Sequence, residues 1–150
     1  MSANAPLPDC PLCREPGGIP VFQAPQWRLI RAEDANFPAF YRLVWQAHVA
    51  EFSDLGPDQR QACMEAVCAV EQVLREGLRP TKINVASLGN VVPHLHWHVI
   101  ARFDWDSHFP NPVWGAALRE LPDAAVQRLP LSLQALDQRM SERLQGLLVP

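Results

Sequence analysis

The stretch His94-Leu95-His96-Trp97-His98-Val99-Ile100 decides the fold prediction, because apolar residues separate its three histidines one by one. Side chains of a β-strand alternate between the two faces of its sheet. A strand over residues 94–103 therefore places the three imidazoles on one face and Leu95, Trp97 and Val99 on a face that can pack on a core. Each ring needs a hydrogen-bond partner or solvent, and three charged rings would repel one another. We expect such a strand to carry chemistry on its polar face.

The sequence on either side of this stretch predicts an α+β domain. A helix is expected from Pro57 to about Gly77, because proline and an acidic residue begin it and apolar residues recur every three or four positions. Further strands are expected at residues 27–31, within 37–49 with an end near His48, and at 81–88. A second amphipathic helix is expected over residues 132–148, with Ser132 as its cap.

Two proline-rich segments are expected to lack regular structure. Residues 1–25 are rich in proline and glycine, which favours an extended arm or loop over a helix. Residues 104–114 are also expected to be irregular. We therefore expect residues 1–114 to form the domain together with its arm. Residues 115–150 are expected to form a C-terminal helical extension packed on the same domain.

Composition excludes several classes of protein. The 150 residues are 48% hydrophobic and 19% charged, which suits one ordinary core and excludes a disordered or fibrous chain. No apolar run approaches the ~20 residues of a membrane span. A net charge of -3 predicts no nucleic-acid partner. The first residues lack a basic region followed by an apolar one, so we expect a cytoplasmic protein with reduced cysteines.

From the residues alone, the histidine cluster has three interpretations. The rings could be partly exposed on a solvated sheet face. They could grip a metal ion from one side, because imidazole is a common ligand of zinc and iron. One ring could instead attack phosphorus and form a covalent intermediate, while its neighbours orient the phosphate and stabilise its charge.

The quoted stretch matches a His-φ-His-φ-His-φ-φ pattern, where φ is apolar, and on this pattern the chain resembles the histidine triad (HIT) family of nucleotide hydrolases and transferases. The resemblance covers about residues 10–114. Within the family, the chain is similar to a compact bacterial branch that is like diadenosine polyphosphate hydrolases. It implies a HIT-like α+β fold: an antiparallel sheet of about five strands with one long helix, followed here by the helical extension.

The resemblance also implies roles for individual residues. His96 occupies the position of the nucleophile on the α-phosphorus, and His98 that of a phosphate contact. His94 occupies the position whose backbone carbonyl orients the nucleophile. For the substrate, the resemblance implies that Asn84 reaches the phosphate, that Asn90 lies near the leaving group and that Asp34 binds the ribose.

One position departs from the family pattern. Val91 stands three residues before His94, where many relatives place a serine or threonine that helps to protonate the leaving group. Valine cannot donate a proton. The chemistry at His96 needs only a neutral imidazole whose Nδ1–H is held by an acceptor. Backbone N–H groups and a second imidazole are expected to stabilise the phosphate without lysine or arginine.

Cys10 and Cys13 form a C-x-x-C pair that could be a metal knuckle, a redox pair or neither. The resemblance implies a structural zinc ion bound by Cys10, Cys13, His48 and His94, since Cys₂His₂ is a good zinc set. The alternative is a free pair on a mobile arm, with His48 only ending a strand. No cofactor is expected to be required for catalysis.

We carry three hypotheses for function. The first is a hydrolase that cleaves a dinucleoside polyphosphate or a nucleoside phosphoramidate through a nucleotidyl-histidine. The second is a non-catalytic nucleotide-binding or interaction module, and the third is a metal-dependent enzyme with the three histidines as ligands. The expected partner is a nucleotide, and HIT relatives imply a homodimer. His108 could lie over the site, at a subunit boundary or only on the surface of its loop, and Trp114 could face the substrate or pack at a dimer contact.

Overall fold

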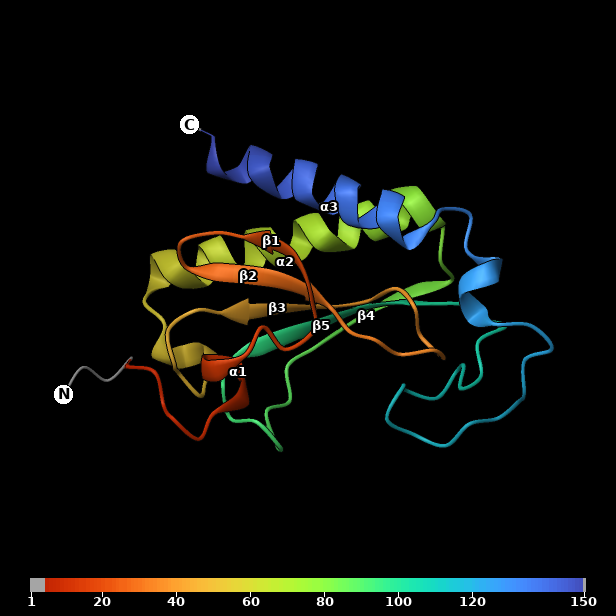
Figure 1. The fold of residues 1–150 in the computed structure, drawn as a ribbon, viewed down its shortest axis with the longest axis horizontal. Coiled ribbons are helices and arrows are strands. Elements are labelled where there is room, and N and C mark those ends of the chain that lie inside the picture. The colour runs from red at the N-terminus through yellow and green to blue at the C-terminus, as the bar shows by residue number, and fades with distance from the viewer. Residues whose placement is uncertain (1–4, 150) are drawn as a thin grey trace.

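A five-stranded antiparallel sheet forms the centre of the computed structural model, which describes residues 5–149 (Figure 1). The strand order is β1-β2-β3-β5-β4. The strands are β1 (Ile19–Gln23), β2 (Trp27–Arg31), β3 (Phe40–Trp45), β4 (Lys82–Ala86) and β5 (His96–Arg102). Three helices accompany the sheet: α1 (Pro11–Arg14), α2 (Pro57–Leu78) and α3 (Leu133–Leu148), with short 3-10 turns at Phe52–Asp54 and Ala125–Arg128. The expected α+β fold is confirmed.

Helix α2 covers one face of the sheet, and its start and stop follow the local sequence. Pro57 takes the first helical position, and the side chain of Gln59 accepts a hydrogen bond from the Gly56 N–H at 3.0 Å. The helix ends at Arg79, which adopts a left-handed conformation with φ of 48°. Its apolar stripe packs against the side of β5 that carries Trp97 and Val99.

Helix α3 lies beside α2 on the same side of the sheet and also contacts β1 (Figure 1). Ser132 caps it as expected, because its hydroxyl oxygen accepts from the Ala135 N–H at 3.1 Å. On its sheet side, Asp137 accepts three hydrogen bonds from Arg31, two from Nε and one from Nη2, and one from the Tyr41 hydroxyl at 2.6 Å. These contacts attach the C-terminal helix to β2 and β3. No helix within residues 5–149 has the length and apolar character that crossing a membrane requires.

The expectation of an irregular arm over residues 1–25 is wrong for residues 11–14 and 19–23, and residues 1–4 lie outside the described part. Within the described part, α1 forms a single helical turn and β1 pairs with β2 as an edge strand. Proline is tolerated at the first position of a helix, and an edge strand tolerates Pro20, near which the pairing register shifts. Proline and glycine content therefore gave the wrong prediction for this segment, because pairing with β2 holds β1 in place.

The strand with the histidine motif is shorter than expected. It begins at His96, so His94 lies before it and does not share the sheet face of His96 and His98. The ladder is interrupted at Leu95, whose N–H donates to the Val49 carbonyl while its own carbonyl accepts from the Trp45 N–H. This bend leaves the His94 side chain free to turn toward α1.

Candidate functional site

His96 lies at the start of β5 with one ring nitrogen held and the other free. Its Nδ1 is 2.6 Å from the backbone carbonyl oxygen of His94, so Nδ1 carries the proton and donates it there. The Ser87 hydroxyl donates to the His96 carbonyl at 2.9 Å and holds the strand in place. Burial lowers the pKa of His96, and the Arg42 charge acts in the same direction. A neutral imidazole with a free Nε2 is a suitable nucleophile.

His98 is the second imidazole on this face of β5. Its ring centroid lies 4.9 Å from that of His96, with Phe40 and Trp114 at 5.5 Å and 5.0 Å on its other sides. Only 5% of the residue is exposed. Burial, followed by the proximity of His96 and Arg42, lowers the pKa of His98 to about 4. His98 is therefore neutral at physiological pH.

A cavity of about 660 Å³ opens over these two rings. Its size is typical of a small-molecule site. Most of its lining is apolar, and the polar side chains that reach it are those of Arg42, Asn90, His96 and His98. Trp114 borders the cavity and is 51% exposed, which offers an aromatic face to a planar ligand.

Arg42 is the residue of this cavity that sequence reasoning missed. It lies on β3 directly opposite His98 on β5, so the two side chains share a face of the sheet. The expectation of a phosphate site without lysine or arginine therefore needs correction, because a permanent cation borders the two imidazoles. The signal in the sequence was the only charged residue within the strand Phe40–Trp45.

Trp114 is carried by the segment after β5, and a buried ion pair shapes that segment. The Arg102 guanidinium donates to Asp106 at 2.8 and 3.1 Å and to the Asn111 carbonyl at 2.7 Å. The same guanidinium donates to Asn84 Oδ1 at 2.9 Å, which leaves the Asn84 amide N–H₂ as its free end. Asn84 shares the sheet face of His98 but does not line the cavity.

The remaining residues expected to bind substrate lie in different places. Asn90 lines the cavity and is exposed, while Val91 beside it is 93% exposed. Asp34 lies in the turn before β3, where its carboxylate accepts from the Asn36 and Phe37 N–H groups, and it does not line the cavity. His108 also lies outside the cavity, with its ring 5.0 Å from that of Phe37.

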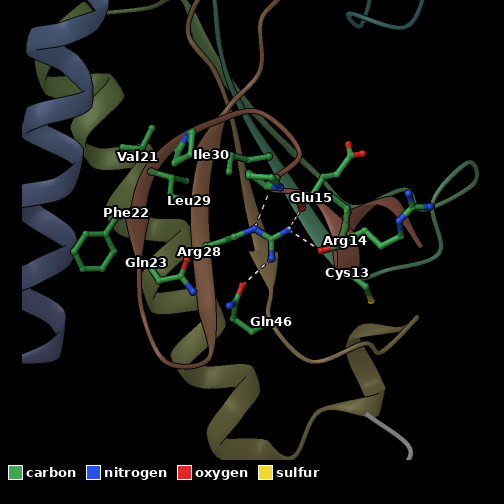
Figure 2. A pocket seen from close by; sticks show the side chains of 13 residues that line it. Cys13, Arg14, Glu15, Val21, Phe22, Gln23, Arg28, Leu29, Ile30 and Gln46 are labelled. Carbon is green, nitrogen blue, oxygen red and sulfur yellow. Dashed lines mark hydrogen bonds between the residues drawn. The ribbon is translucent and has the colours of Figure 1, made fainter. Parts of the chain in front are cut away.

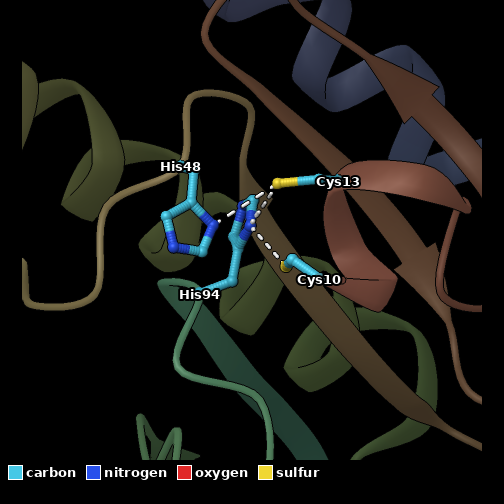
Figure 3. Close-up of side chains that lie close together, drawn as sticks. All are labelled: Cys10, Cys13, His48 and His94. Atoms are coloured by element: carbon cyan, nitrogen blue, oxygen red, sulfur yellow. Dashed lines mark hydrogen bonds between the residues drawn. The ribbon is translucent and has the colours of Figure 1, made fainter. Parts of the chain in front are cut away.

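Cys10, Cys13, His48 and His94 converge beside α1, where the two cysteine side chains point toward the two histidines (Figure 3). Their ligand atoms all lie within 4.8 Å of one another. The thiol sulfurs of Cys10 and Cys13 are 3.4 and 3.5 Å from His94 Nδ1, and Cys13 is 3.4 Å from His48 Nδ1. A tetrahedral zinc ion with ordinary bond lengths separates its sulfur and nitrogen ligands by about 3.5 Å. The cluster therefore has the donors and the spacing of a closed zinc site.

The orientation of His94 agrees with this chemistry. Its Nε2 is 2.6 Å from the Trp45 carbonyl oxygen, so Nε2 carries the proton and Nδ1 presents its lone pair to the cysteines. The backbone carbonyl of the same residue accepts from His96 Nδ1. One residue thus links the cysteine cluster to the imidazole in the cavity.

Arg28 clamps α1 to the sheet beside this cluster. Its guanidinium crosses a second cavity of about 430 Å³ and donates to Gln46 Oε1 at 2.7 Å (Figure 2). It also donates to the carbonyl oxygens of Leu12, Glu15 and Pro16 at 2.8 to 3.1 Å. The arginine therefore satisfies carbonyl groups at the end of α1, whose turn carries Cys13. The Arg28 guanidinium in this cavity is therefore already hydrogen-bonded to groups of the protein.

The chain is similar to proteins of one family. The model of the HIT domain matches residues 18–105. A histidine triad protein from Bradyrhizobium japonicum is 31% identical, with 83% of this chain and 89% of that chain covered and a TM-score of 0.68. One from Marinobacter aquaeolei VT8 is 25% identical, with 88% and 92% covered and a TM-score of 0.69. A Zn-bound histidine triad family protein from Mycobacterium smegmatis is 19% identical, with 93% and 95% covered and a TM-score of 0.55. No curated protein sequence matches the chain significantly.

Proposed function

The chain belongs to the HIT domain family, and on that premise we propose that it is an enzyme that cleaves a nucleotide phosphoanhydride or phosphoramidate through His96. The observation that carries the proposal is the hydrogen bond from His96 Nδ1 to the His94 carbonyl. It leaves Nε2 as the basic nitrogen at a cavity large enough for a nucleotide. Family membership supports nucleotide binding, and the ring geometry supports nucleophilic catalysis.

The proposed reaction has two steps. The Nε2 lone pair of His96 attacks the α-phosphorus, a P–N bond forms, and the bond to the leaving group breaks with its electron pair. The His94 carbonyl stabilises the positive charge that develops on the ring. Water then attacks the same phosphorus and loses a proton to solvent, a P–O bond forms, and the P–N electron pair returns to His96. Dinucleoside polyphosphates and nucleoside phosphoramidates are the substrate classes proposed.

The other site residues have supporting roles in this proposal. His98 contacts the phosphate, for which its neutral ring offers one N–H. Asn90 contacts the substrate from the edge of the cavity. Asn84 offers its amide N–H₂ from β4, with its oxygen held by Arg102. We retain Asp34 as the residue that binds the ribose. Because Asp34 does not line the cavity, this contact requires its turn to move toward the ligand.

We also propose that Cys10, Cys13, His48 and His94 bind one structural zinc ion. The support is the spacing of their ligand atoms and the Nε2 contact of His94 to Trp45, and a structurally similar protein is described as Zn-bound. Bound there, zinc would stabilise the fold and hold the His94 backbone that orients His96. Metal analysis of the purified protein should give about one zinc per chain.

The experiment that tests the enzymatic proposal is nucleotide release followed by chromatography. Wild type, His96→Ala and the control His108→Ala are each incubated with a dinucleoside tetraphosphate and with an adenosine phosphoramidate. We expect turnover by wild type and His108→Ala, and none by His96→Ala. Equal turnover by His96→Ala would exclude the histidine nucleophile.

Two other functions give different results. Tight nucleotide binding without turnover by wild type would indicate a non-catalytic module, which the missing hydroxyl at Val91 favours. A metal-dependent enzyme requires the three histidines to meet at one ion. The ring of His94 instead faces Cys10 and Cys13, away from the cavity that His96 and His98 line.

The family and the sequence also support broader proposals. We propose that the protein acts in the cytoplasm, as a homodimer, without a nucleic-acid partner. Residues 1–114 would contain the nucleotide site, and residues 115–150 would be an extension that α3 attaches to the sheet through Asp137.

A further inference from the structure

The guanidinium of Arg42 forms no ion pair among the described residues, and the Asp34 carboxylate that favours its charge acts from beyond ion-pair distance. Within residues 5–149, the ion pairs of arginine are those of Arg31, Arg102 and Arg143, and Arg42 has no carboxylate within 4.0 Å. Its Nη1 makes one long contact of 3.4 Å to the Gly17 carbonyl, and its buried Nε has no partner. Half-buried charge without a partner is unfavourable, so a bound anion would improve its environment.

The position of Arg42 directs this charge to the substrate. It faces His98 across adjacent strands and borders the same cavity as His96. Its guanidinium lies 5.1 Å from the centre of the Phe40 ring, and this contact holds it by packing. The Nδ1 of His98 is also buried without a partner. The polar groups on this part of the sheet are thus incompletely satisfied until an anion binds.

The cavity lacks a group that could protonate a leaving group. No serine, threonine, tyrosine, lysine or carboxylic acid lines it among the described residues. Val91 has no hydroxyl, the amide of Asn90 is not an acid, and His98 has a pKa of about 4. A departing amine needs a proton, because an amide anion is far too basic to leave. A departing phosphate needs none, because it leaves as a stable anion.

These two observations point in the same direction. Resting on the function proposed above for the site, we propose that Arg42 is a specificity-determining residue that selects substrates with an anionic leaving group. It would favour a phosphoanhydride, whose leaving group is a phosphate chain, over a phosphoramidate, whose leaving group is an amine. When the phosphorus–oxygen bond breaks, its electron pair stays on the departing phosphate, and the guanidinium of Arg42 neutralises the added charge.

The test measures kcat/KM for a dinucleoside tetraphosphate and for an adenosine phosphoramidate. The variants are Arg42→Gln, which removes the charge, Arg42→Lys, which keeps it, and Arg75→Gln, which alters an exposed arginine on α2. We expect Arg42→Gln to lower kcat/KM for the tetraphosphate about 10- to 100-fold, the scale of a lost charged hydrogen bond. Its phosphoramidate value should change less than about threefold. Arg42→Lys should retain most of the tetraphosphate activity, and Arg75→Gln all of it.

Val91→Ser provides an independent arm. A hydroxyl at this position should raise kcat/KM for the phosphoramidate and leave the tetraphosphate value nearly unchanged. The inference is overturned if Arg42→Gln lowers kcat/KM equally for both substrates, or for neither. It is also overturned if wild type has the higher kcat/KM for the phosphoramidate. Melting temperatures within a few degrees of wild type establish that the variants fold.

Failure of the proposed function gives a different pattern. If wild type turns over neither substrate, the same variants are compared by calorimetric binding of adenosine 5′-diphosphate and adenosine 5′-phosphoramidate. Arg42→Gln should then weaken the diphosphate at least about tenfold more than the phosphoramidate. Equal weakening of both would reject Arg42 as the selecting residue, even in a protein that only binds nucleotides.

Discussion

Replacing Asp106 by alanine tests how the segment over the site is held. The Asp106 carboxylate accepts from Arg102 Nε at 2.8 Å and Nη2 at 3.1 Å. It also accepts from the backbone N–H groups of Phe103, His108 and Phe109 at 3.2, 3.0 and 2.7 Å. Both charged residues are 2% exposed. Burial raises the pKa of Asp106, but the hydrogen bonds outweigh burial and lower the pKa below its ordinary value.

The expected loss of stability is large. Removing one member of a buried ion pair costs about 3–5 kcal/mol, because the other charge stays buried without a partner. Small domains have total stabilities of about 5–15 kcal/mol, so Asp106→Ala would remove a large part. Replacing both residues, as Arg102→Met with Asp106→Leu, removes the stranded charge. We expect the double variant to be less destabilised than Asp106→Ala alone.

Urea unfolding measures these free energies, and the exposed Asp104→Ala serves as the matched control. A loss below about 1 kcal/mol for Asp106→Ala would refute the reasoning, since it would mean that the buried Arg102 finds another partner or solvent. A double variant as unstable as Asp106→Ala would refute it too. Because the segment carries Trp114, we also expect Asp106→Ala to raise KM for the nucleotide substrate.

Three further predictions concern the cysteine cluster and the histidines. A chelator should lower the melting temperature of wild type but leave that of Cys13→Ser unchanged. An equal shift of both melting temperatures would argue against a zinc site. Arg28→Met should weaken zinc binding about 10- to 100-fold in a competition with a chelating dye, because α1 loses its clamp, whereas Arg14→Met should not. The pKa of His98, lowered to about 4, makes the folded state bind fewer protons than the unfolded state between pH 6.5 and 4. The contribution of His98 to the free energy of unfolding is therefore complete above pH 6.5 and should fall by about 3 kcal/mol as the pH drops to 4. His98→Phe should flatten the plot of unfolding free energy against pH over this range.

Local signals predicted most of the regular structure correctly. The strand over residues 27–31 agrees with β2, and the proline and the serine that begin the two long helices lie where the sequence placed them. These features depend on neighbours in the chain: the fixed φ of proline, the hydroxyl of a cap and the spacing of apolar side chains. The region before residue 25 did not follow local signals, because β1 exists through its pairing with β2.

By itself, the sequence determined the alternation around His96 and His98 and the presence of a C-x-x-C pair, since both are patterns of near neighbours. The tertiary structure decided which residues join them. Arg42 was hidden in a strand whose two faces are both largely apolar, and the register with β5 brings it opposite His98. Cys10 meets His94 across 84 positions of the chain. Such meetings depend on strand order and on the bend at Leu95, and no short stretch of residues carries either.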